Sequence, residues 1–131
     1  MEPYKKIANL LWETSSSNHA STAKLDIMPK NVNKLLVANR GEIALRVVRT
    51  AREMGIPTVA VYAEQDRHAQ YVQMADDAYL LSGDTYKDTY LNEDLLIDIL
   101  QRSGADAVHP GYGFLSEVAS FAQKVLDARK K

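Results

Sequence analysis

The sequence contains no cysteine, and this absence excludes several kinds of chemistry. A chain without thiols forms no disulfides, has no thiolate nucleophile, and cannot hold zinc or an iron–sulfur cluster through cysteine ligands. A protein without disulfides fits a reducing compartment. We therefore expect a cytoplasmic protein.

The sequence also lacks an excess of charge of one sign and lacks long apolar runs. Sixteen lysines and arginines stand against seventeen aspartates and glutamates, which gives a formal net charge of −1 at pH 7. Such a balance provides no broad positive field for nucleic acid. The apolar runs, such as residues 35–38 and 95–97, are far shorter than the roughly 20 residues that cross a membrane. We expect no nucleic acid and no membrane among the partners.

The 131 residues suffice for one domain, and the first 33 of them differ from the rest. A short apolar patch at residues 7–12 is followed by the polar run TSSSNHASTA, which cannot bury enough apolar surface to offset its ordering entropy. Residues 1–33 also contain no arginine and no continuous apolar core, so they favour neither a secretory nor a mitochondrial signal. We predict a flexible leader over residues 1–33 and a folded domain over residues 34–131.

The leader has one alternative interpretation. Its apolar residues could form an amphipathic turn that docks on a partner or on the domain, although so short a helix is marginal in water by itself. These residues are Tyr4, Ile7, Leu10, Leu11 and Trp12.

From residue 34 onward, apolar runs of strand length alternate with segments of helical period. We predict strands at residues 34–39, 58–63, 78–81 and 105–108. We predict helices at residues 42–54, 93–103 and 118–128, and a short helical turn at 71–75. This alternation implies right-handed crossovers, and so an α/β fold with a mainly parallel, Rossmann-like sheet and helices on both faces.

Two short motifs follow predicted strands, NRGE at residues 39–42 and HPGYG at residues 109–113. Ligands of such sheets bind outside the carboxyl ends of the strands, where both motifs emerge. Gly111 and Gly113 indicate a sharp turn or a close approach, and an ordinary chain reversal is the alternative. Gly41 is the only glycine between the first strand and its helix, so the dinucleotide fingerprint is missing. NRGE could offer backbone N–H groups to an anion, or could simply form a tight turn.

Single residues with candidate roles also have simpler interpretations. The arginine stripe, defined as Arg46, Arg49 and Arg52, fits either a solvated helix face or a protein interface. His109 precedes a proline and has no second ligand at metal spacing, so we predict a structural role and no metal site. Glu117 lies near a predicted helix start, where the helix dipole alone would stabilise its carboxylate.

Taken together, the longer motifs resemble a known family. The stretch KLLVANRGEIALRVVRTAREMGIPTVAVYAEQDR, followed by ADDAYLL, YLNEDLLIDI and ADAVHPGYGFLSE, resembles the N-terminal domain of biotin carboxylase, as found in acetyl-CoA, propionyl-CoA and pyruvate carboxylases. The resemblance covers about residues 34–128. It implies the first part of an ATP-grasp ligase, in which ATP and bicarbonate give carboxyphosphate, whose CO2 passes to a ureido nitrogen of biotin on a carrier domain.

The resemblance also implies roles for residues. It places Tyr112 and Gly113 beside the biotin and bicarbonate pocket, makes Glu117 a polar wall of the active site and the candidate catalytic residue, and assigns Arg49 to a dimer interface. Val118 stands where the family typically has asparagine. Implied partners are the remaining biotin carboxylase domains, a biotin carrier domain, a carboxyltransferase and a second copy in a homodimer. Implied cofactors of the complete enzyme are biotin, ATP and Mg²⁺.

The chain ends before the regions that would correspond to the ATP-grasp lid and the C-terminal domain, which carries the metal-binding acids. Because phosphoryl transfer depends on metal ions and cations that hold the phosphate oxygens, we expect no biotin carboxylation by this chain alone and no tight binding of these cofactors. The alternative is a non-catalytic binding module that pairs with a full-length carboxylase.

Overall fold

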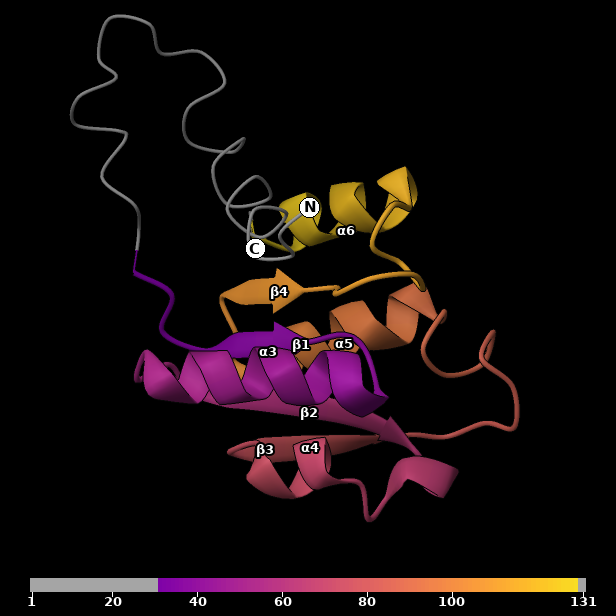
Figure 1. The fold of residues 1–131 in the computed structure, drawn as a ribbon. Coiled ribbons are helices and arrows are strands. Elements are labelled where there is room, and N and C mark those ends of the chain that lie inside the picture. Colours follow the sequence, from indigo (N-terminus) through magenta and orange to yellow (C-terminus); the bar gives the residue numbers. More distant parts are fainter. Residues whose placement is uncertain (1–30, 130–131) are drawn as a thin grey trace, which may run out of the picture.

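The computed structural model describes residues 31–129, and within them four strands form one parallel sheet (Figure 1). The order across the sheet is β3-β2-β1-β4. The strands are β1 Leu35–Val37, β2 Thr58–Ala63, β3 Asp77–Leu81 and β4 Ala107–His109. In register, Leu36 pairs with Val59 of β2 on one side and with Val108 of β4 on the other.

Helices cover both faces of the sheet, as the sequence predicted. Helix α3 (Gly41–Glu53) and the short α4 (Gln70–Met74) cover one face, and α5 (Glu93–Ser103) and α6 (Ala119–Arg129) cover the other. Alternate residues of β1 point to opposite faces of the sheet. Val37 belongs to the hydrophobic cluster under α3, whereas Leu36 belongs to the hydrophobic cluster under α5 and α6. The α/β fold class is confirmed.

Local capping chemistry sets the ends of α5. The Asn92 side-chain oxygen accepts a hydrogen bond of 3.1 Å from the backbone N–H of Leu95, so it caps the helix. At the other end, Gly104 takes a left-handed conformation with φ of 76°, which costs glycine little. The predicted helix at residues 93–103 is therefore confirmed, with both of its ends.

The helical period of the sequence predicts one buried stripe on α3, made of Ile43, Ala44, Val47, Val48, Ala51 and Met54. The structure differs at two positions. Met54 lies just past the helix and its side chain is 68% exposed, whereas Leu45, outside the predicted stripe, is buried. A strict i, i+3, i+4 pattern misses Leu45 because the helix packs both on the sheet and against α4, which widens its buried face.

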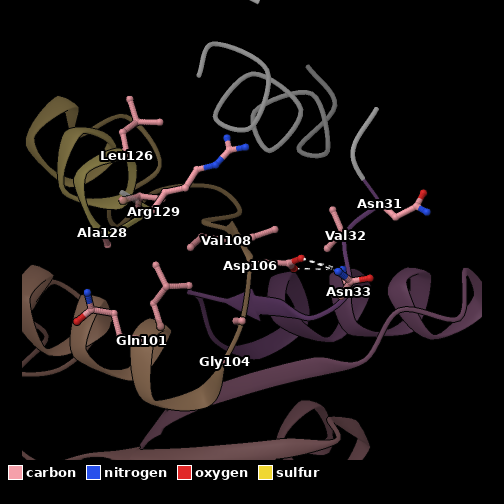
Figure 2. Close-up of a pocket in the computed structure, with 14 residues that line it drawn as sticks. Asn31, Val32, Asn33, Gln101, Gly104, Asp106, Val108, Leu126, Ala128 and Arg129 are labelled. Atoms are coloured by element: carbon pink, nitrogen blue, oxygen red, sulfur yellow. Dashed lines mark hydrogen bonds between the residues drawn. The ribbon is translucent and has the colours of Figure 1, made fainter. Parts of the chain in front are cut away.

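The predicted leader lies mostly outside the described residues. Only its last three residues, 31–33, belong to the described part, and Asn33 is held there by the carboxylate of Asp106. The Asn33 backbone N–H donates to Asp106 Oδ1 over 3.1 Å, and the Asn33 amide donates to Asp106 Oδ2 over 3.2 Å (Figure 2). Across residues 31–129 no helix has the length and apolar character needed to span a membrane.

Candidate functional site

The carboxyl ends of the strands meet at one edge of the sheet because all strand pairs are parallel (Figure 1). Four connections emerge at this edge: residues 38–40 after β1, the 3-10 turn η1 (Glu64–Asp66) after β2, residues 82–92 after β3, and residues 110–118 after β4. Since β1 lies between β2 and β4, the chain leaves the sheet in opposite directions on its two sides. Such a switch point is where α/β sheets bind ligands.

Asn39 joins the loop after β1 to the loop after β4. Its side chain is buried, and its amide nitrogen donates to the backbone oxygens of Pro110 and Tyr112, each over 2.8 Å. Its side-chain oxygen accepts from the backbone N–H of Arg40 over 2.8 Å. Both donors and the acceptor of the amide are therefore used, and this side chain helps to fix the backbone at Tyr112.

The contact between Asn39 and the loop after β4 also requires glycine at position 111. Gly111 has a φ of 66°, and a Cβ built on it would lie 2.7 Å from Ile43 Cγ2 and 2.8 Å from the amide nitrogen of Asn39. Its backbone N–H donates to Nδ1 of the buried His109 over 3.0 Å. The predicted close approach is confirmed, and what approaches Gly111 is the chain itself. The histidine has the structural role that the sequence predicted.

The structure brings three of the four predicted site residues together on the loop after β4. Tyr112 is 42% exposed, Gly113 has a φ of 64° with open space where a Cβ would lie, and the exposed Glu117 lies two residues before α6. Arg49 is not part of this group. It lies in the third turn of α3 with its side chain exposed.

Arg40 and Asp66 form an ion pair that joins the loop after β1 to the turn after β2. The guanidinium donates from Nε to Oδ2 over 2.7 Å and from Nη2 to Oδ1 over 2.6 Å, a bidentate geometry. These hydrogen bonds lower the pKa of Asp66 and raise the pKa of Arg40, so both groups are charged at neutral pH. Asp66 is buried and Arg40 is half-buried, which shields the pair from solvent.

Two buried tyrosines extend this ion pair into the core. The Tyr90 hydroxyl donates to Asp66 Oδ2 over 2.6 Å and accepts from the backbone N–H of Ala63 over 2.9 Å. Burial, together with the hydrogen bond to Asp66, raises the pKa of Tyr90 to about 12. The Tyr71 hydroxyl lies 3.1 Å from that of Tyr90 and donates to the backbone oxygen of Val61, and burial raises its pKa as well.

An aromatic cluster links residues 82–92 to the loop that carries Tyr112. The ring of Phe114 stacks on Tyr90 with centroids 5.3 Å apart and meets Tyr86 edge-on at 5.2 Å. The guanidinium carbon of Arg40 lies 6.0 Å from the Tyr86 ring centroid. Phe114 has a φ of 40°, an unfavourable value for a bulky residue, which persists only where surrounding contacts impose it. Aromatic packing thus holds the loop at Phe114, whereas Asn39 holds it at Pro110 and Tyr112.

Sequence reasoning missed the ion pair and the aromatic cluster. The available signal was positional: Arg40 follows β1 closely and Asp66 follows β2 closely, and β1 and β2 are neighbours with their carboxyl ends at one edge. Nothing in the local sequence of residues 82–92 indicated that Tyr90 would be buried. Among residues 31–129, no three His, Asp or Glu side chains lie close enough together to hold a metal ion.

Comparison with known proteins gives consistent matches. The family model described as "Biotin carboxylase, N-terminal domain" matches residues 31–131. The chain is 55% identical over 97 residues to the biotin-dependent acyl-coenzyme A carboxylase alpha3 subunit of Mycobacterium leprae, covering 74% of this chain and 16% of that protein. It is 53% identical over 92 residues to biotin carboxylase 1 of Bacillus subtilis, covering 70% of this chain and 20% of that protein.

Solved structures give the same result. One is the biotin carboxylase domain dimer of Hydrogenobacter thermophilus 2-oxoglutarate carboxylase, in complex with MgADP, ADP and bicarbonate. It superimposes with a TM-score of 0.72 at 48% identity, covering 75% of this chain and 21% of that chain. In each of these comparisons the chain spans about a fifth of the matched protein or less.

Proposed function

The chain belongs to the biotin carboxylase N-terminal domain family, and from this premise we propose that it supplies the first part of an ATP-dependent biotin carboxylase. The complete enzyme carboxylates biotin with bicarbonate and ATP, and its product serves a carboxyltransferase through a biotin carrier domain. Bound Mg²⁺ supplies the charge that holds the phosphate oxygens during phosphoryl transfer. This chain contributes the sheet edge on which one side of the carboxylation pocket is built.

The observation that carries the proposal is the attachment of the Tyr112 loop to the sheet edge. Asn39 holds the backbone on both sides of Gly111, and this leaves Tyr112 and Gly113 exposed at the switch point. With no side chain in the way, the backbone of Gly113 can approach a ligand closely. In this proposal Tyr112 and Gly113 contact biotin or bicarbonate, and Glu117 forms a polar wall of the same pocket as the candidate catalytic residue.

The remaining ligands of the reaction belong to other parts of the enzyme. Residues 31–129 place no three metal-ligating side chains together, so we assign the residues that hold Mg²⁺ to the domains that this chain would join. The chain alone therefore positions neither ATP nor the metal against biotin. We assign it no carboxylation activity of its own and no tight binding of biotin or ATP.

Complementation tests this assignment. The 131-residue chain is mixed with the separately produced lid and C-terminal domains of a biotin carboxylase, and bicarbonate-dependent ADP release is measured with free biotin. We expect no release from either component alone and release from the mixture. A mixture no more active than its parts would count against a role as one piece of a split enzyme.

A second candidate is a non-catalytic module that pairs with a full-length carboxylase. It is favoured by the side chains of Arg46 and Arg49, which are exposed on α3 and form no ion pair within the described part of the chain. Arginine is enriched at protein interfaces because its planar fork forms several directed hydrogen bonds.

Binding to purified, full-length biotin carboxylase 1 of Bacillus subtilis tests this second candidate. We expect Arg49→Glu to abolish co-purification, whereas Arg102→Glu, the same charge reversal on α5, leaves it intact. A chain that stays monomeric and does not associate with the carboxylase even at high concentration would remove this candidate.

A further inference from the structure

Tyr90 contacts two of the other connections at the carboxyl edge. It belongs to residues 82–92, which follow β3. Its hydroxyl donates to Asp66 of the turn after β2 over 2.6 Å, and its ring stacks on Phe114 of the loop after β4 with centroids 5.3 Å apart. Tyr90 is only 1% exposed, so both contacts lie inside the fold of residues 31–129.

The polar contacts of Tyr90 fix the tilt of its ring. At the far end of the side chain, the hydroxyl both donates to Asp66 and accepts from the backbone N–H of Ala63 in β2 over 2.9 Å. Asp66 is itself held by the bidentate pair with Arg40. A buried network whose members are paired in this way rigidifies the side chains that form it. The ring of Tyr90 therefore presents a fixed surface to Phe114.

The backbone at Phe114 depends on that surface. The Ser116 N–H donates to the Gly113 oxygen over 2.9 Å, which closes a turn. Phe114 is the first central residue of this turn and has a φ of 40°, a conformation that glycine, asparagine or aspartate normally takes there. A bulky residue keeps such a conformation only where surrounding contacts impose it. The stack on Tyr90 is such a contact.

We infer that Tyr90 is a positioning residue for the carboxylation pocket, an inference that rests on the proposed function. Phe114 directly follows Gly113, so the dihedral angles imposed on Phe114 set the direction of the backbone that carries Gly113 and Tyr112. Because Tyr90 is buried, it acts on these two residues through Phe114 and touches no ligand. A displacement of about 1 Å can cost about 100-fold in rate. We therefore expect loss of the Tyr90 hydrogen bonds to weaken the binding of biotin or bicarbonate.

Tyr90→Phe tests the first step, because it removes the hydroxyl and keeps the ring. The matched control is Tyr71→Phe, which removes another buried hydroxyl, the donor to the backbone oxygen of Val61, from a ring that lies in the hydrophobic cluster under α3. Hydrogen exchange is measured in the 131-residue chain at two amides. One is Ser116, whose N–H closes the turn, and the other is Ala38, whose N–H donates to the last residue of β4.

We expect Tyr90→Phe to speed exchange at Ser116 about tenfold, as for the loss of a hydrogen bond to a charged group, and to change exchange at Ala38 little. Tyr71→Phe should change exchange at the two amides by the same factor. If Ser116 is accelerated relative to Ala38 equally in both variants, the inference is overturned.

The effect on the pocket is measured in a chimera in which residues 31–129 replace the matching segment of biotin carboxylase 1 of Bacillus subtilis. Bicarbonate-dependent ADP release is followed while free biotin, bicarbonate and ATP are varied in turn. We expect Tyr90→Phe to raise the KM for biotin or bicarbonate several-fold and to leave the KM for ATP unchanged, and we expect Tyr71→Phe to change none of the three. A mere loss of folded enzyme would lower the apparent kcat and leave every KM as it was.

Phe114→Leu tests the route from Tyr90 to the pocket, since it removes the stack and keeps the hydrogen bonds to Asp66. When Tyr90→Phe is added to Phe114→Leu, we expect no further change in KM, and effects that multiply would overturn the inference. An active chimera whose KM values are unaffected by Tyr90→Phe would overturn it as well. A folded chimera without substitutions that releases no ADP would instead contradict the proposed function, and the inference would fall with it.

Discussion

At the scale of single residues, Asn39 helps to attach the Tyr112 loop to the sheet. The loop after β4 has no strand pairing of its own, and its backbone oxygens at Pro110 and Tyr112 find their donors in one buried amide. A buried carbonyl left without a donor costs free energy. Asn39 is therefore one of the residues that attach this loop to the sheet, together with the packing of Phe114.

Asn39→Ala removes both of these donors. We expect the free energy of unfolding to fall by about 1–3 kcal/mol and the amide proton of Gly111, which donates to His109 Nδ1, to exchange faster. Chemical denaturation and hydrogen exchange measure the two effects. Asn92→Ala is the matched control, because it removes the helix cap of α5 at a cost of about 1 kcal/mol and leaves the loop attached. Equal exchange at Gly111 in both variants would contradict the role of Asn39.

The two glycines of the loop allow a second test at this scale. Ala at either position must adopt a left-handed conformation, which costs about 1–2 kcal/mol. At Gly111 the added Cβ also meets Ile43 Cγ2 at 2.7 Å, whereas at Gly113 it meets nothing within 4 Å. We therefore expect Gly111→Ala to be less stable than Gly113→Ala by about a further 1–3 kcal/mol in urea unfolding. Equal stabilities would show that the loop does not pack as described.

At the scale of elements, the Arg40–Asp66 pair ties the β1 and β2 connections together, and the aromatic cluster ties in the remaining two. Tyr90 belongs to both, because its hydroxyl donates to Asp66 while its ring stacks on Phe114. The loops at the carboxyl edge are thus held by one connected set of contacts. We expect a substitution in one of these loops to alter the packing of the others.

The pH dependence of stability tests the ion pair. Arg40→Gln should lower the free energy of unfolding by about 2 kcal/mol at pH 7, since charged hydrogen bonds to Asp66 are lost. Because Arg40 lowers the pKa of Asp66 in the folded state, this stabilisation is present above the unfolded-state pKa of about 3.9 and is lost as the pH falls below it. The difference between wild type and variant should therefore be constant from about pH 5 to pH 8 and shrink below about pH 4.

The matched control for this pH series is Arg67→Gln. It breaks a pair with Glu64 that lies on the surface, where both side chains are exposed. We expect no measurable change in unfolding from this control. A difference between wild type and Arg40→Gln that stays the same at pH 3 would show that the Asp66 carboxylate is not the partner that matters.

Local chemistry determines the elements that could be predicted from the sequence. The contacts that the sequence did not predict are determined by tertiary neighbours. Asn92 and Gly104 mark the ends of α5 through hydrogen bonds and backbone angles within a few residues of the chain. The run TVAVYA indicated β2 because apolar residues fall on both faces of the strand, as in a strand that is covered on two sides. Asp66 and Tyr90, by contrast, are 24 residues apart and meet only when the sheet has formed.

At the scale of the whole molecule, the parallel sheet brings the carboxyl ends of all its strands to one edge. This edge presents the candidate site around Tyr112, held by Asn39, the ion pair and the aromatic cluster. We propose that it faces the rest of a carboxylase.

The most direct test of the central claim is a chimera in which residues 31–129 of this chain replace the matching segment of biotin carboxylase 1 of Bacillus subtilis. The measurement is bicarbonate-dependent ADP release with free biotin. We expect the chimera to be active, and we expect Tyr112→Ala in the chimera to lose activity without losing the fold. A folded chimera with no ADP release would contradict the claim that this sheet edge supplies a working side of the carboxylation pocket.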